Sequence, residues 1–349
     1  MGHVFRSDVQ ELAVQSLRRY LDAEVEPVYN REYRDRFVPK DVLGAIMQRL
    51  AGFGLVSGVV ADERLGGLGL DWLTAVMLFE EVATTSIDLS VPVAINSFGA
   101  SLLDKIAPEH LRERYLPGLL RGETFVSIAV SEPGAGSNVM EIRTRARRDG
   151  DDYIISGEKT WISNGGYSDF LICTCRTSDE PRGGLTHFLI DRKEHPYEVS
   201  EISKVAFNSQ STAQIFLSDV RVPAANILGE EGKGLSNTLS LFERSRVYVA
   251  AQAVGIARRA LEETLRYTTE RRQHGKVIAG HQLVAATIAE MATNLDAALE
   301  MAGSQPRIRP PSLVRRPMAL LLPPSQAWLC QTGCAVLPSP AGGRPSEGT

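Results

Sequence analysis

Long hydrophobic runs, cysteine and an excess of charge are all scarce in this sequence of 349 residues. No apolar run approaches the ~20 residues of a membrane-spanning helix, so we expect no membrane segment. The first eight residues carry charge and lack the apolar stretch of a secretory signal. Four cysteines are too few for a disulfide framework, which favours reducing conditions and a cytoplasmic protein. A net charge of −4 and a pI near 6.0 argue against nucleic acid as the main partner.

Composition changes abruptly after Ala302. Residues 303–349 contain nine of the 18 prolines, five arginines and a single acidic residue, Glu347. Prolines at this density prevent any helix longer than about a dozen residues. We therefore expect an aberrant, disordered Pro/Arg-rich tail, whose dispersed arginines form no compact patch for nucleic acid.

Three regions of different periodicity precede this tail. Residues 1–122 have helical patterns, beginning with the Ser7-x-x-Gln10 spacing of a capping box. Residues 123–231 contain short β-branched and aromatic runs separated by turns, which predicts a central antiparallel β-barrel domain. Residues 232–302 return to the helical period, as two long helices joined by residues 275–280. The predicted fold is thus α+β, with an N-terminal helical domain, the barrel, and a C-terminal helical bundle that is incomplete.

Residues 131–137, which read S-E-P-G-A-G-S, follow a predicted strand. Their small side chains permit close backbone approach, and exposed N–H groups on such a turn can hold a phosphate or a planar ring system. The dinucleotide fingerprint is excluded because no helix follows directly. A simple tight turn is the alternative interpretation.

Residues 158–166, which read E-K-T-W-I-S-N-G-G, combine a strand with a turn. Trp161 and Ser163 are two residues apart and so share one face of the strand. There the indole can cover an aromatic cofactor while the hydroxyl donates to it. The alternative is a core tryptophan beside a hairpin. Cys173 and Cys175 also share a strand face, and we interpret them as buried thiols and predict no metal site.

The long helix carries charged residues at two places. Glu243 and Arg246 lie near its start, and Arg271 lies at its end, followed by His281 and Gln282. Arginines near a helix end can clamp phosphates with two hydrogen bonds. The alternative is an ordinary solvated face.

Together these segments resemble the flavin-dependent acyl-CoA dehydrogenases. That family combines an S/T-E-P-x-A-G-S loop, a W-I-T/S-N-G-G strand and a long helix ending in E-R-x-x-F-G followed by H-Q. All three occur here in that order, between about residue 6 and Leu299, with His274 in place of the phenylalanine of the third motif. The resemblance implies α,β-dehydrogenation of an acyl-CoA thioester with hydride transfer to N5 of FAD. It also implies an electron-transfer flavoprotein as electron acceptor, and a homodimer or homotetramer that shares its cofactor between subunits.

The resemblance implies a role for each matching residue. Ser131 and Ser163 match hydroxyls that bond the flavin, and Trp161 matches the indole stacked beside it. Arg271, Gln273, His281 and Gln282 match residues that bind the FAD of a neighbouring subunit. The full set of expected cofactor-binding residues is Ile128, Ser131, Ser137, Trp161, Ile162, Ser163, Arg271, Gln273, His281 and Gln282. The expected substrate-binding residues are Ser137, Glu243 and Arg246.

The catalytic base of the family has no clear counterpart. Most members carry it in a Y-E-G-T loop, and Glu347 in the terminal S-E-G-T is a candidate on a proline-broken segment. An isovaleryl-type branch carries it on the long helix, where this chain has Ser245. Glu243 lies two helical steps, or about 200°, away from that position. The catalytic residue is therefore unknown at this stage.

The incomplete bundle has an energetic consequence. About ten large apolar side chains would stay exposed, a loss of roughly 15–30 kcal/mol of burial against a total stability of ~5–15 kcal/mol. We therefore expect a chain that is poorly folded from Leu235 onward and impaired in turnover. Two alternatives are a non-catalytic remnant that binds FAD and acyl-CoA, and a flavin oxidase or monooxygenase of the same fold.

Overall fold

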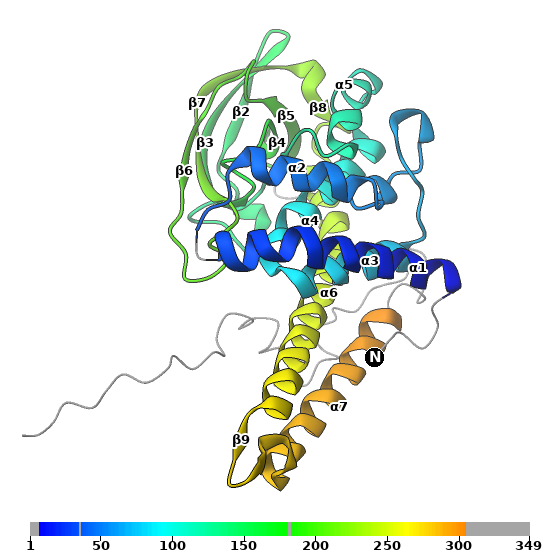
Figure 1. Cartoon of the computed structure of the whole chain (residues 1–349). Coiled ribbons are helices and arrows are strands. Elements are labelled where there is room, and N and C mark those ends of the chain that lie inside the picture. The colour runs from blue at the N-terminus through cyan, green and yellow to red at the C-terminus, as the bar shows by residue number, and fades with distance from the viewer. Residues whose placement is uncertain (1–6, 35, 181–182, 305–349) are drawn as a thin grey trace, which may run out of the picture. The chain divides into compact units, whose positions relative to one another are not determined.

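The computed structural model describes residues 7–34, 36–180 and 183–304 (Figure 1). Its N-terminal part is helical: α1 (Asp8–Tyr20), α2 (Lys40–Ala51), α3 (Trp72–Thr85), α4 (Ile87–Ile106) and α5 (Glu109–Leu120). The predicted capping box is confirmed, because the Ser7 hydroxyl accepts from the Gln10 amide and the Gln10 side chain accepts from the Ser7 amide. Among the described helices, none is long and apolar enough to cross a membrane.

The central part of the chain is a sheet of eight strands. They are β1 (Val126–Ala129), β2 (Arg145–Asp149), β3 (Asp152–Ser163), β4 (Phe170–Arg176), β5 (Leu185–Asp191), β6 (Glu198–Glu201), β7 (Thr212–Pro223) and β8 (Ile227–Leu228). Their order is β6-β7-β3-β2-β4-β5-β8, with β1 paired to β4. One face buries an apolar core of its own, separate from the core of the helices.

This sheet corrects the predicted antiparallel barrel. The end strands β6 and β8 do not pair, so the sheet is not closed. The pairing is also mixed, because β1 runs parallel to β4, and β2 meets β4 in parallel at Arg145 and Arg176. β1 and β2 thus succeed one another along one edge of β4. A barrel needs every strand paired on both sides with one consistent stagger, which this arrangement prevents.

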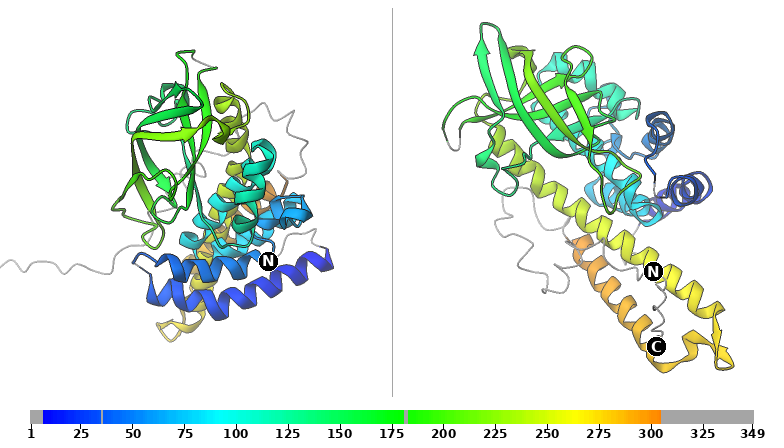
Figure 2. Two further views of the ribbon diagram at one scale, coloured as in Figure 1. Left: turned by 90° about the horizontal axis from the view of Figure 1, so that it is seen from above. Right: turned by 90° about the vertical axis from the view of Figure 1, so that its left-hand side faces the viewer.

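The C-terminal part contains two long helices, α6 (Gly234–Glu270) and α7 (Gln282–Ser304), joined through the short strands β9 (Arg272–Gln273) and β10 (Lys276–Val277). Figure 2 shows α7 running back alongside α6, as the predicted hairpin requires. Leu295 and Leu299 of α7 are buried against Val254 and Leu261 of α6. The predicted tail and its candidate Glu347 lie outside the described residues.

Helix α6 crosses α3 at close range. A Cβ atom on Gly255 would lie 2.9 Å from the Cβ atom of Ala83, so glycine is what allows this approach. Next to the crossing, the buried Arg258 forms ion pairs with Glu80 at 3.2 Å and Glu81 at 2.7 Å. The part of α6 just beyond its midpoint is therefore held by packing and charge.

Candidate functional site

The two motif segments predicted to hold a flavin lie side by side. The backbone amide of Thr160 donates to the carbonyl oxygen of Ser131 at 3.0 Å. A second bond joins them, because the hydroxyl of the buried Ser127 donates to the carbonyl oxygen of Ser163 at 3.0 Å. The motif patterns did not predict this role for Ser127, since a serine in a strand gives no sign of its partner. β1 and the residues that follow it thus run beside the last residues of β3.

Trp161 occupies an unusual backbone conformation at this place. Its φ angle is +60°, in the left-handed region, and the register of β3 against β7 shifts between Lys159 and Ile162. Left-handed backbone at a bulky residue costs of order 1–3 kcal/mol and clusters at functional sites. The bulge keeps Ile162 buried and leaves the indole 63% exposed. The core-tryptophan interpretation is therefore wrong.

A buried ion pair also joins these two segments. Lys159 and Glu132 are 0% and 8% exposed, and Nζ lies 2.9 Å from Oε1 of the carboxylate. Burial by itself raises the pKa of Glu132, but Lys159 and the hydrogen bonds from Thr144 and Arg143 outweigh it and hold this pKa below its usual value. The carboxylate is therefore ionised, and the pair adds no net charge to the site.

The glycine-rich turn brings α6 into the same neighbourhood. Glu132 and Ala135 exchange two backbone hydrogen bonds, at 2.9 and 3.1 Å, which leaves Ser137 exposed beyond a tight turn. Phe242 of α6 packs against the apolar cluster that contains Ala135. The first part of α6 thus adjoins the glycine-rich turn.

The two predicted substrate-binding residues of α6 are solvent-accessible. Glu243 and Arg246 are both exposed, whereas Ser245 between them is half-buried and donates to the carbonyl oxygen of Phe242 at 3.1 Å. The carboxylate of Glu243 therefore projects from a different side of the helix than Ser245. This agrees with the angle expected from two helical steps.

The remaining predicted cofactor residues lie at the far end of α6, beside β9 (Figure 1). They are Arg271, Gln273, His281 and Gln282. His281 Nε2 lies 3.3 Å from the carbonyl oxygen of Gln273, so this group forms one cluster. The 37 residues of α6 span about 55 Å, and the helix begins where Gly234 packs on the backbone of Leu185 in the sheet. One chain does not bring both groups together.

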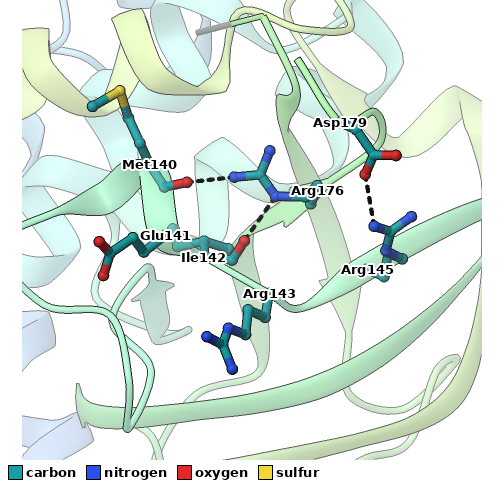
Figure 3. A pocket seen from close by; sticks show the side chains of 7 residues that line it. All are labelled: Met140, Glu141, Ile142, Arg143, Arg145, Arg176 and Asp179. Carbon is teal, nitrogen blue, oxygen red and sulfur yellow. Dashed lines mark hydrogen bonds and ion pairs between the residues drawn. The ribbon is translucent and has the colours of Figure 1, made fainter. Parts of the chain in front are cut away.

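An open pocket of about 540 Å³ follows the glycine-rich turn (Figure 3). Arg176 donates to the carbonyl oxygens of Ile142, at 2.8 Å, and Met140, while Arg145 pairs with Asp179 at 2.7 Å. These contacts brace the backbone that leads from Ser137 into β2. A second cavity of about 720 Å³ lies between α1, α3, α6 and α7. Neither cavity is lined by a predicted site residue.

The two strand cysteines are buried, as predicted. Cys173 and Cys175 are 0% exposed, and their Sγ atoms lie 3.6 Å apart. Within the described ranges, no cluster of three or more His, Cys, Asp or Glu side chains suits a metal ion.

These features suit a planar aromatic cofactor. An exposed indole on a strained bulge offers a stacking face, and Ser131 and Ser163 lie in the two segments that adjoin it. Such an arrangement is compatible with a flavin-dependent oxidoreductase. Sequence profiles of the acyl-CoA dehydrogenase N-terminal, middle and C-terminal domains match residues 7–123, 127–220 and 232–304. The chain belongs to the acyl-CoA dehydrogenase family, whose members are FAD-dependent oxidoreductases.

Relatives and solved structures agree with this assignment. Cyclohexane-1-carbonyl-CoA dehydrogenase of Geobacter metallireducens is 35% identical over 256 residues, 73% of this chain and 67% of the relative. The glutaryl-CoA complex of a glutaryl-CoA dehydrogenase has a TM-score of 0.81 at 30% identity, covering 87% of this chain and 78% of that one. The Mycobacterium smegmatis glutaryl-CoA dehydrogenase in complex with FADH2 has a TM-score of 0.80 at 25% identity, covering 87% and 76%.

Proposed function

We propose that this chain binds FAD beside Trp161 and receives an acyl-CoA thioester next to it. The observation that supports this most directly is the hydrogen bond from Thr160 to Ser131, because it holds the two motif segments against each other. When bound, FAD supplies a two-electron acceptor for a hydrogen on the β-carbon of the acyl group. The hydroxyls of Ser131 and Ser163 orient the ring system, and the indole of Trp161 covers one of its faces and excludes water there.

The same proposal assigns the substrate contacts. Ser137, exposed beyond the glycine-rich turn, lies where a thioester ligand and the cofactor pyrophosphate approach the chain. Glu243 and Arg246 contact the nucleotide portion of coenzyme A from the exposed side of α6. The glutaryl-CoA and cyclohexane-1-carbonyl-CoA dehydrogenases among its relatives support a CoA thioester, while the acyl group itself stays open.

A second subunit completes the cofactor site in this proposal. The cluster at the tip of α6 and α7 lies about 44 Å along the helix from Phe242, which packs near the glycine-rich turn, so it serves a neighbouring chain's FAD. A homodimer or homotetramer follows, and an electron-transfer flavoprotein is the proposed electron acceptor. The exposed position of the cluster supports such an exchange.

Proton removal is the step for which the described residues are poorly equipped. An α-proton of a thioester needs a carboxylate base and a stabilised thioester oxygen. Ser245 occupies the position at which one branch of the family carries that base, and Glu243 projects from another side of the helix. We therefore place this chain as an FAD- and acyl-CoA-binding protein with impaired turnover.

Anaerobic addition of acyl-CoA to the FAD-loaded chain tests both the proposed binding of acyl-CoA and the proposed impairment of turnover. We expect a perturbed flavin spectrum, which reports binding, without rapid bleaching. Rapid bleaching would show that turnover is intact and that a base exists. A spectrum that no acyl-CoA perturbs would contradict the proposed substrate class, and peroxide formation under air would favour the oxidase alternative.

A further inference from the structure

Two charged residues inside the flavin motifs have no role in the proposal above. Glu132 follows Ser131 directly, and Lys159 precedes Trp161 by two positions. Both are buried, with Lys159 0% and Glu132 8% exposed. Burying two charges is costly, and apolar residues of similar volume would hold a scaffold equally well. Their position between the two motifs calls for a separate explanation.

Lys159 uses all of its hydrogen-bonding capacity. An ammonium group has three N–H donors. Nζ donates to Glu132 Oε1 at 2.9 Å, to the carbonyl oxygen of Val130 at 3.1 Å and to that of Thr174 at 2.7 Å. Val130 extends β1, and Thr174 lies in β4. The side chain thus ties β3 to both of these segments immediately before the Trp161 bulge.

Glu132 anchors the glycine-rich loop from the other side. Its Oε2 accepts from the Arg143 amide at 2.7 Å, and its Oε1 accepts from the Thr144 amide at 2.9 Å. These bonds close the loop that contains Ser137 at its base. Charge-assisted hydrogen bonds are shorter and more directional than apolar contacts. The loop is therefore fixed in orientation as well as in distance.

From these contacts we infer that the Glu132–Lys159 pair is a positioning pair for the flavin site, which sets Ser131 and Ser137 against the exposed indole of Trp161. The inference rests on the proposed function, since it concerns how that site is held. The pair touches neither cofactor nor substrate and acts through the two loops. Its effect should therefore appear in cofactor affinity and in the spectrum of the bound flavin.

The variant Glu132→Gln keeps the shape of the side chain but has one acceptor oxygen in place of two. Its amide N–H₂ would face a backbone N–H, and Lys159 would lose its counter-charge. Glu81→Gln is the matched control, because Glu81 is also buried, at 2%, and pairs with Arg258 at 2.7 Å and Arg18 at 2.7 Å between helices. Both variants lose stability, so stability alone does not distinguish them.

FAD affinity and flavin absorption, measured on both variants and on Lys159→Met, show whether the pair positions the flavin site or only stabilises the fold. We expect Glu132→Gln and Lys159→Met to weaken FAD binding at least tenfold relative to Glu81→Gln and to shift the visible bands of the flavin. Equal affinity and equal spectra in all variants would overturn the inference and leave the proposed function intact.

A chain that binds no FAD at all would refute the proposed function instead. Hydrogen exchange then still tests the pair, because the Thr160 amide donates to Ser131 across the two loops. Faster exchange of the Thr160 amide in Glu132→Gln, but not in Glu81→Gln, would support the positioning role. Unchanged exchange at Thr160 would overturn it.

Discussion

The amide of Thr160 donates to the carbonyl oxygen of Ser131 at 3.0 Å, and this bond joins two motifs that are separated in sequence by β2 and most of β3. The strained, exposed Trp161 lies next to the bond. A conformation that costs energy and exposes an aromatic ring is best explained by a ligand that the ring contacts.

Replacing Trp161 separates cofactor binding from folding. The variant Trp161→Gly relieves the left-handed strain, so we expect its free energy of unfolding to change by less than about 1 kcal/mol despite the loss of a large side chain. FAD affinity should fall at least tenfold. Trp161→Ala keeps the strain and loses the indole, and serves as the control. A loss of several kcal/mol in Trp161→Gly would mean that the indole is structural.

Ser245→Glu restores a carboxylate where one branch of the family carries its base. The half-buried position of Ser245 on α6 makes room for a side chain directed differently from that of Glu243. We expect the variant to bleach its flavin on addition of acyl-CoA at least tenfold faster than the unchanged chain. Ser245→Gln, which adds a side chain of the same shape without a carboxylate, should leave the rate of bleaching unchanged. Equal rates in Ser245→Glu and the unchanged chain would contradict the assignment of this position.

The buried His187 makes stability depend on pH. Burial, assisted by Lys159, lowers the pKa of His187 to about 4. The unfolded chain binds the proton near pH 6.5, so the folded state loses about 1.4 kcal/mol per pH unit as pH falls from 6.5 toward 4. The pKa of Glu132 is lowered in the folded state, so this carboxylate adds a further loss of stability only when pH falls below the usual pKa of a glutamate. Denaturant unfolding at pH 7 and pH 5 should show this loss, and His187→Gln should remove most of it.

Substitution of Gly255 tests whether α6 is folded onto α3, and substitution of Gly44 in α2 is the control. Gly255→Ala would place a Cβ atom 2.9 Å from Ala83 and from the backbone of Glu80, so we expect a loss of about 1–3 kcal/mol. Gly44→Ala in α2 meets no atom within 4 Å and should gain about 0.5–1 kcal/mol. If the region from Leu235 onward is poorly folded, as the sequence led us to expect, Gly255→Ala will instead be neutral or stabilising.

Local patterns were sufficient for several elements. The capping box of Ser7, the strand runs and the α6–α7 hairpin all follow from nearest-neighbour signals. The sequence did not reveal α4, because Pro92 lies inside it and most of its residues are buried, which removes the amphipathic period.

Long-range pairing accounts for the remaining differences between the predicted and the observed structure. The sheet is open because β1 pairs in parallel with β4, and local runs carry no record of such a partner. The burial of Lys159 could not be predicted from the sequence either, since lysine is normally a surface residue and its three acceptors come from separate segments. The motif residues Ser131 and Trp161 were predicted because a resemblance supplied their roles. The structure adds that they adjoin.

Titration of the purified chain with FAD, followed by flavin absorbance and by heat of binding, shows whether the Trp161 site holds a flavin. We expect saturable binding with one FAD per chain, weakened at least tenfold in Trp161→Ala. An unchanged chain that is folded, as judged by its cooperative unfolding, and yet binds no FAD would contradict it.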